Sequence, residues 1–145
     1  MYLAQFNIAE ALADDNSPVM ADFFSNIDRI NAIADNAPGF IWRLTDDAGE
    51  ASSSIRPFDS EFVLVNMSLW KNRESLFNFV YHSDHLEIYK RKKEWFHKVP
   101  KMHMVLWYVA EDHIPSLEEA MERLEHLRTH GEAPYAFSFK SSFTP

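Results

Sequence analysis

Two histidines, His82 and His85, are the residues whose type and spacing come closest to catalytic chemistry. They stand three positions apart, so on a continuous helix they share one face, where they can act as base and partner or hold a metal ion. A metal site needs at least one further ligand, and only a nearby acid or His103 is available for it. We therefore predict no metal site and name His85 and His82 as candidate bases. The competing interpretation is that both are surface or capping groups at a break in the helix.

A second group of polar residues lies in the strand expected over residues 62–70, where successive side chains point to opposite faces of a sheet. Asn66 is the candidate from this group for donating a hydrogen bond to a substrate oxyanion. The competing interpretation is that Asn66 and Ser68 only bond one another across the core of a dimer. The odd face of the strand holds Val63, Val65, Met67 and Leu69, and the even face holds Asn66, Ser68 and Trp70.

An apolar pocket with a few convergent polar groups is the usual form of a small-molecule site, and these residues predict one. Arg56 is a further candidate, as a clamp for an anionic ligand group, although such an arginine also pairs with a nearby acid such as Asp59. The 4 tryptophans of the chain suit a flat aromatic ligand and equally suit a core. The remaining ligand-binding candidates are Asn7 with Gln5, Trp42 or Arg43, Ser68, Trp70, His103 and Trp107.

The composition excludes several classes of function. The formal charge of -8, from 22 acidic and 14 basic residues, repels a phosphate backbone, so nucleic acid is not an expected partner. The chain has no cysteine, which excludes thiol catalysis and thiolate metal sites, and only 3 glycines, which disfavours phosphate-cradling loops. There is no run of about 18 apolar residues and no signal peptide, so we expect a cytoplasmic protein with no membrane partner.

The hydrophobic pattern predicts a single domain over residues 1–145. The helix after the third strand is expected to stop and restart near Ser83, which can cap a second segment. The C-terminal helix opens with a capping box formed by Ser116 and Glu119. In chain order we expect a strand over 2–8, a helix from Ser17 to Pro38, strands over 40–44 and 62–70, a helix from Asn72 to Phe96, a strand over 102–109, a helix over 116–131 and an extended tail over 135–143.

This order of elements is that of an α+β, ferredoxin-like βαββαβ fold with an extra C-terminal helix and tail. Two helices cover one face of such a sheet, yet the strands carry aliphatic side chains on both faces. A second copy, sheet against sheet, is the simplest cover, and the aromatic content of 14% supports such an interface. We predict a homodimeric α+β barrel, and the alternative is that the C-terminal helix folds over the open face. If the helices cover the odd face of residues 62–70, the polar even face points into the barrel.

Several stretches along the chain carry a family resemblance. They are LAQFNIAE, PGFIWRL, IRPF, LVNMSLW, FVYHSDHLEIYKRKKEWF, MVLWYV and SLEEAMERLEHLRTHG with the AFSF tail. Over nearly its whole length the chain resembles the uncharacterised DUF3291 family of the dimeric α+β barrel superfamily. The resemblance implies the barrel fold and a dimer, and it implies no settled activity.

Neighbouring families in that superfamily are cofactor-independent antibiotic-biosynthesis monooxygenases and haem-degrading monooxygenases. The haem degraders use an asparagine on the first strand, which Asn7 matches. They also use a tryptophan and a histidine on the helix after the third strand, where this chain has Phe79 and Tyr89. These two departures count against haem chemistry, so we expect no cofactor. Haem is the alternative, with Tyr89, His82 or His85 as its ligand.

The resemblance and the pocket residues together predict a protein that binds a small hydrophobic or aromatic molecule. The leading hypothesis is a cofactor-independent, monooxygenase-like enzyme acting on an aromatic or quinol-type substrate. His85 or His82 would assist the deprotonation of that substrate for its reaction with dioxygen. The alternatives are a non-catalytic binder of a hydrophobic metabolite or haem, and a structural dimer with a filled barrel.

Overall fold

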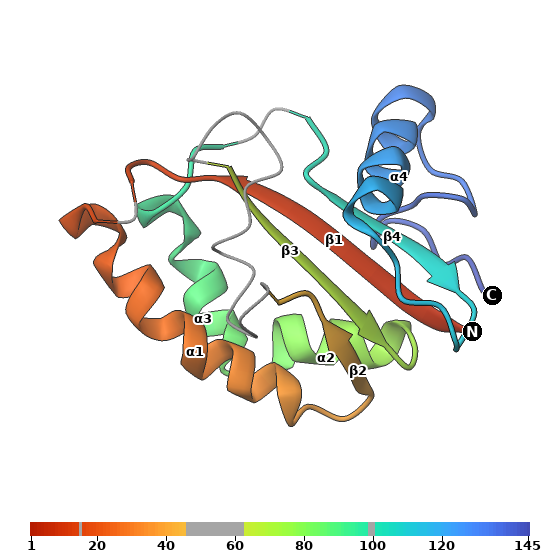
Figure 1. Ribbon diagram of the computed structural model, residues 1–145, viewed down its shortest axis with the longest axis horizontal. Helices are drawn as coiled ribbons and strands as arrows, with labels where there is room; N and C mark the ends of the chain where they lie inside the picture. Colours follow the sequence, from red (N-terminus) through yellow and green to blue (C-terminus); the bar gives the residue numbers. More distant parts are fainter. Residues whose placement is uncertain (15, 46–62, 99–100) are drawn as a thin grey trace.

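The computed structural model describes residues 1–14, 16–45, 63–98 and 101–145 (Figure 1), so Arg56 lies outside the described residues. None of the described helices is both long and apolar enough to cross a membrane. The strands are β1 (Tyr2–Glu10), β2 (Phe40–Arg43), β3 (Val63–Trp70) and β4 (Met104–Val109). The helices are α1 (Ala21–Asp35), α2 (Arg73–His82), α3 (His85–Lys90) and α4 (Leu117–His130), with short 3-10 turns η1 (Pro18–Met20) and η3 (Lys92–Glu94).

The four strands form one antiparallel sheet in the order β2-β3-β1-β4. α1 connects β1 to β2, and α2 with α3 connects β3 to β4, which is the ferredoxin-like βαββαβ topology that the sequence predicted. In Figure 1, α1, α2 and α3 lie together on one side of the sheet, and α4 lies apart from them beside β4. The α+β fold class is therefore confirmed.

The helix layer formed by α1, α2 and α3 lies on the even-numbered face of β3, so an arrangement in which these helices cover its odd face is wrong. The rings on the even face account for this, because Trp70 stacks on Phe79 of α2 with ring centres 5.1 Å apart. The polar side chains of that face consequently point toward the helix layer. The buried cluster on this side consists of Leu3, Ala34, Trp70, Leu76, Leu106 and Phe137.

The opposite face of the sheet packs against α4; it carries the odd-numbered residues of β3 and β4 and the even-numbered residues of β1, and it is called the odd face below. Phe6, Met67 and Trp107 are fully buried there, in one cluster with Leu124 and Leu127 of α4. This confirms the alternative in which the C-terminal helix folds over the face that the other helices leave open. Among the described residues, no exposed large apolar side chain belongs to the odd face of β1, β3 or β4. A homodimer is therefore not supported by an uncovered apolar face, because α4 covers that face. The homodimer stays a prediction.

The helical segment between β3 and β4 stops and restarts, as the sequence predicted. Asn72 begins α2 by accepting a hydrogen bond from the backbone N–H of Ser75 at 2.8 Å. Ser83 stands between α2 and α3 in an extended conformation, and its hydroxyl accepts a hydrogen bond from the backbone N–H of His85 at 3.2 Å. Because of this break, His82 and His85 do not share the face of one continuous helix.

The C-terminal tail covers the outer edge of β4. Phe137 and Leu106 exchange two backbone hydrogen bonds, of 2.7 and 3.0 Å. Arg73 of α2 donates to the carbonyl oxygen of Phe139 at 2.7 Å, and the adjoining tail packs in the same buried cluster as α2. The predicted extended tail is confirmed, and it lies over an apolar surface.

Glu119 joins α4 to the odd face of the sheet. Its Oε2 accepts a hydrogen bond from the indole N–H of Trp107 at 2.8 Å, and its Oε1 lies 2.6 Å from Nε2 of His113. Glu119→Ala should lower the free energy of unfolding by about 1–3 kcal/mol, because it leaves the buried indole N–H without an acceptor. Urea denaturation measures this. Glu118→Ala, on the same turn but exposed, is the control, and an equal loss in both variants would show that the bond to Trp107 contributes nothing.

Candidate functional site

Polar side chains meet on the helix side of the two central strands. The antiparallel register of β1 and β3 places Gln5 opposite Ser68 and Asn7 opposite Asn66. On the other side of β3, Arg43 of β2 is the partner of Ser68. The sequence left open whether Trp42 or Arg43 would join this group, and the register gives Arg43. The name polar patch is used below for Gln5, Asn7, Arg43, Asn66 and Ser68.

A chain of hydrogen bonds crosses the polar patch. The indole N–H of Trp70 donates to Ser68 Oγ at 2.9 Å, and the Ser68 hydroxyl donates to Gln5 Oε1 at 2.9 Å. Gln5 Nε2 then donates to Asn7 Oδ1 at 2.7 Å. Gln5, Ser68 and Trp70 are buried, whereas Asn7 is partly exposed. The series of hydrogen bonds therefore begins in the core at Trp70 and reaches solvent at Asn7.

The direction of this hydrogen-bond chain is set at its buried end. An indole nitrogen is a donor only, so Ser68 Oγ must accept from Trp70. Gln5 Oε1 is the acceptor of the Ser68 hydroxyl among the described residues. Turning the Gln5 amide over would leave that buried hydroxyl hydrogen without an acceptor, at a cost of about 1–3 kcal/mol, which is roughly a 5- to 150-fold preference. The amide orientation seen in the structure is therefore the favoured one.

Solvent reaches the sheet at the end of this chain. Asn66 is exposed although β3 is an interior strand. On the helix side, α1 has Ala34 as its one buried residue and α3 has none, while Ile27 and Ile30 in the apolar stripe of α1 are half-buried. A fully packed interface between a helix layer and a sheet buries such residues. Asn66 and its partner Asn7 thus occupy an accessible part of the interface between the two layers.

His85 lies at the start of α3, partly buried against α2. Its ring is tilted against Phe79 with ring centres 4.8 Å apart, and its Nδ1 lies 3.2 Å from the carbonyl oxygen of Val80. A carbonyl oxygen only accepts hydrogen bonds, so Nδ1 carries the hydrogen and Nε2 keeps a free lone pair. Burial lowers the pKa of His85 below its usual value, and the hydrogen bond to Val80 opposes this shift. His85 is therefore neutral at neutral pH and suited to act as a base.

A groove of about 620 Å³ lies between α1 and α2, and His82 lines it. Phe79 forms part of the groove and also packs against Trp70 and His85. The rings of His82 and His85 make no contact with each other, because the break after α2 sends them to different neighbours. The two candidate bases are consequently not brought together. The apolar part of the groove is formed by Ala32, Ile33, Ala37, Pro38 and Phe79.

Three predicted pocket residues lie away from the polar patch. Trp42 and Trp107 belong to the cluster on the odd face of the sheet, so they do not line a pocket with Asn66. His103 precedes β4, and its side chain is exposed. The prediction grouped these residues because the alternation of side chains along a strand does not tell which faces of separate strands coincide.

Of the residues suggested as haem ligands, His85 and Tyr89 lie on α3 and His82 is the last residue of α2. Tyr89 is exposed, and its hydroxyl accepts a hydrogen bond from Lys92 Nζ at 3.2 Å. Within the described ranges, no group of three or more His, Cys, Asp or Glu side chains is arranged to hold a metal ion. Haem ligation by Tyr89, His82 or His85 stays a prediction.

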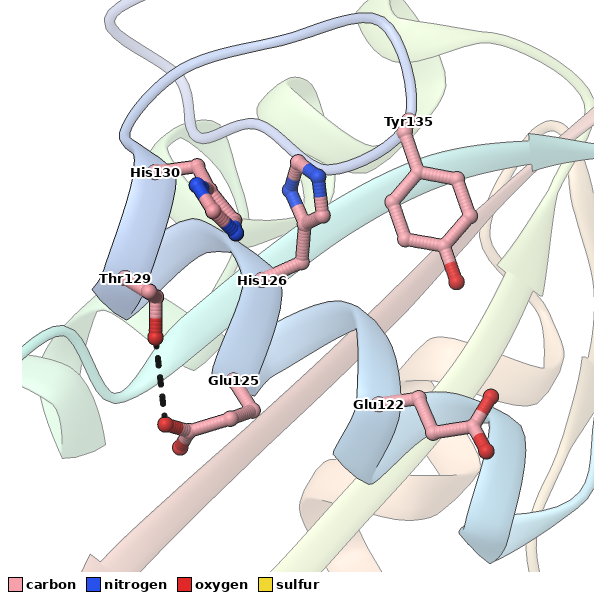
Figure 2. Close-up of a pocket in the computed structure, with 6 residues that line it drawn as sticks. All are labelled: Glu122, Glu125, His126, Thr129, His130 and Tyr135. Atoms are coloured by element: carbon pink, nitrogen blue, oxygen red, sulfur yellow. Dashed lines mark hydrogen bonds between the residues drawn. The ribbon is translucent and has the colours of Figure 1, made fainter.

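A second cavity, of about 470 Å³, lies along α4 (Figure 2). In it, the ring of His126 stands next to the rings of Tyr135 and His130, with both centre-to-centre distances 4.7 Å. Nδ1 of His126 is buried and has no hydrogen-bond partner in the part of the chain that the structure describes. Sequence reasoning missed this cluster. The available signal was the spacing of the two histidines on one helix face, with Tyr135 brought back to them after Gly131.

The topology and the polar patch define an α+β protein of the ferredoxin-like fold with an accessible polar surface between sheet and helices. The family model described as "Domain of unknown function (DUF3291)" matches residues 2–145, and the chain belongs to this family. A search of curated proteins found no match.

The solved structures similar to the chain include SnoaB, a cofactor-independent oxygenase from Streptomyces nogalater, and a mutant of that protein. Both share 16% sequence identity with this chain, covering 79% of it and 98% of their own chains. The TM-scores are 0.53 and 0.54. At this level of identity, the likeness shows the fold alone.

Stability should depend on pH through His85. Its pKa is lowered in the folded state, so on acidification the unfolded chain binds a proton before the folded chain does. The contribution of His85 to the free energy of unfolding is therefore full above the unfolded pKa of about 6.5 and is lost as the pH falls from there to the lower folded pKa. Urea unfolding at about pH 7.5 and about pH 5.5 should show a larger loss for the wild-type protein than for His85→Gln. Equal losses would contradict the buried, neutral histidine, and His82→Gln at an exposed position is the control.

Proposed function

We propose that the chain binds a small hydrophobic or aromatic molecule at the polar patch, between sheet and helix layer, and oxidises it with dioxygen without a bound cofactor. The observation that carries this proposal is the exposure of Asn66 on an interior strand, opposite Asn7 and beside a buried hydrogen-bond chain. An exposed amide adds little to the stability of a core. A ligand that hydrogen-bonds to Asn66 would explain why an amide lies at this position.

The surroundings of the polar patch suit a flat, apolar ligand. Trp70 packs between Phe40 and Phe79, with ring centres 5.5 and 5.1 Å away. The Trp70 ring is buried, so a ligand with a ring system would instead contact the partly exposed Phe40 or Phe79, whose positions Trp70 fixes.

The oxidative part of the proposal is supported by the fold shared with SnoaB, described as a cofactor-independent oxygenase. In such a reaction the substrate supplies the electrons itself. A ring CH2 carbon becomes a carbonyl: one oxygen atom of O2 enters the product, and the other leaves as water with the two hydrogens, so no further reductant is needed. The protein has to bind the substrate, remove a proton from its enol or phenol form and stabilise the anion that results.

Asn66 is the proposed hydrogen-bond donor to the anionic oxygen, and His85 is the proposed base. The support for His85 is its neutral form and the free lone pair on its Nε2. Phe79 and Trp70 stand between its ring and the polar patch, so a substrate that reaches both must extend along this aromatic pair. His82, in the groove between α1 and α2, is the second candidate base.

Asn66→Ala should weaken ligand binding and turnover while leaving the fold intact. The side chain is exposed, so the free energy of unfolding should change by less than about 0.5 kcal/mol. Loss of one donor to the developing anion should lower kcat about 10²- to 10³-fold. Oxygen uptake with 1,4-naphthoquinol, above its uncatalysed rate, measures turnover, and calorimetric titration with 1,4-naphthoquinone measures binding.

Asn78→Ala is the matched control, since Asn78 is also an exposed asparagine but lines the groove between α1 and α2. Normal binding in Asn66→Ala with lost binding in Asn78→Ala would move the ligand to the groove and contradict the proposal. With a substrate long enough to extend along Phe79 and Trp70, His85→Ala should keep binding and lose turnover. Binding without oxygen uptake by the wild-type protein would make the chain a non-catalytic binder, and absence of binding would favour a structural role.

A homodimer is part of the same proposal. Among the described residues, β2 pairs only with β3, and Ile41 on this edge strand is exposed. An edge strand with an exposed apolar side chain favours association with a second copy. Size-exclusion chromatography with light scattering should give twice the mass of one chain for the wild-type protein and the mass of one chain for Ile41→Lys. A wild-type protein with the mass of one chain would overturn the dimer.

A further inference from the structure

We infer that the hydrogen-bond chain from Trp70 to Asn7 makes the site selective for ligands that present an oxygen acceptor, such as a carbonyl, phenolate or enolate oxygen. Ligands that present an N–H or O–H donor at the same point are disfavoured. The inference rests on the proposed binding site at the polar patch and names the chemistry of the group that binds there.

Asn7 is the residue through which this selectivity acts. Its Oδ1 faces inward and accepts a hydrogen bond from Gln5 Nε2 at 2.7 Å. The two hydrogens on its Nδ2 have no acceptor among the described residues, and the side chain is partly exposed. An amide whose oxygen is turned inward turns its N–H groups outward. Asn7 therefore offers donors to a ligand that lies over Asn7 and its cross-strand partner Asn66.

The orientation of Asn7 is imposed from the buried end of the chain. Trp70 can only donate, so Ser68 turns its own hydrogen toward Gln5 Oε1. Gln5 then has only its N–H groups left for Asn7. An isolated surface asparagine turns its amide over freely, whereas this one is linked to three buried groups that favour one direction. Trp70, Ser68 and Gln5 are thus positioning residues that set which end of Asn7 a ligand meets.

Arg43 adds a second donor on the same side of the sheet. It is the cross-strand partner of Ser68, and its Nη1 is buried without a hydrogen-bond partner among the described residues. Its Nε donates to Asp35 Oδ1 at 2.9 Å, which fixes the position of the guanidinium group. A positively charged group with an unused N–H near the polar patch strengthens the preference for a strongly accepting or anionic oxygen.

Hydrogen exchange of side-chain amides tests the direction of the chain without any ligand. In the 15N-labelled protein, both Nδ2 hydrogens of Asn7 should exchange rapidly with water. One Nε2 hydrogen of Gln5 and the indole hydrogen of Trp70 should exchange at least about tenfold more slowly than those of Asn7. Ser68→Ala should remove the protection at Gln5 and Trp70 together. A protected Asn7 hydrogen beside an unprotected Gln5 amide would show that the chain runs the opposite way and would overturn the inference.

Matched ligands test the selectivity itself. 1,4-Naphthoquinone presents two acceptors and 1,4-diaminonaphthalene two donors on the same ring frame, and the wild-type protein should bind the quinone about tenfold more tightly. Asn7→Asp keeps an acceptor for Gln5 but replaces the outward N–H groups with an oxygen, so the preference should vanish or reverse. An unchanged preference in Asn7→Asp, or a wild-type preference for the diamine, would overturn the inference. Failure of both compounds to bind the wild-type protein would overturn the proposed function and the selectivity with it, whereas reversed exchange protection with intact binding overturns the inference alone.

Discussion

The pairing of β1 with β3 is the interaction on which the rest of the structure depends. In this register Gln5 faces Ser68 and Asn7 faces Asn66, so the amides and the hydroxyl gather on one face while the other face of the same strands stays apolar. A shift of one residue would turn every side chain of one strand to the opposite face and break the hydrogen-bond chain. Both strands are interior, so the buried Gln5 and Ser68 must find hydrogen-bond partners, whereas the exposed Asn66 is open to water or a ligand.

Trp70 couples the packing of the core to the polarity of the site. Its ring lies between Phe40 and Phe79, and its indole nitrogen begins the hydrogen-bond chain through Ser68. Because the ring is fully buried, its orientation is fixed by its aromatic neighbours. The direction in which Asn7 presents its amide is therefore a consequence of aromatic packing several side chains away.

Local signals in the sequence were sufficient for most of the fold. Asn72 caps α2 as the sequence predicted, and Ser83 lies at the predicted break, although the residue in the N-cap position of α3 is Asp84. Strict alternation in β3 correctly placed Asn66, Ser68 and Trp70 on one face. The sequence did not predict whether that face packs against the helices. Both faces of the strands carry apolar side chains, and their alternation does not tell which face the helices cover. The cluster on α4 and the separation of the two candidate bases were missed for a related reason, since each depends on contacts between residues that lie outside a single periodic segment.

The tail that pairs with β4 also affects the tendency of the protein to aggregate. An uncovered edge strand offers free backbone N–H and C=O groups to any extended chain nearby, which is how β-rich proteins begin to aggregate. Here the backbone of Phe137 occupies the β4 edge, and the contact between Arg73 and Phe139 holds the arm in place. The tail from Phe137 thus protects the β4 edge from pairing with other chains. A chain truncated before Phe137 would expose this edge and would be prone to aggregate even with an intact site.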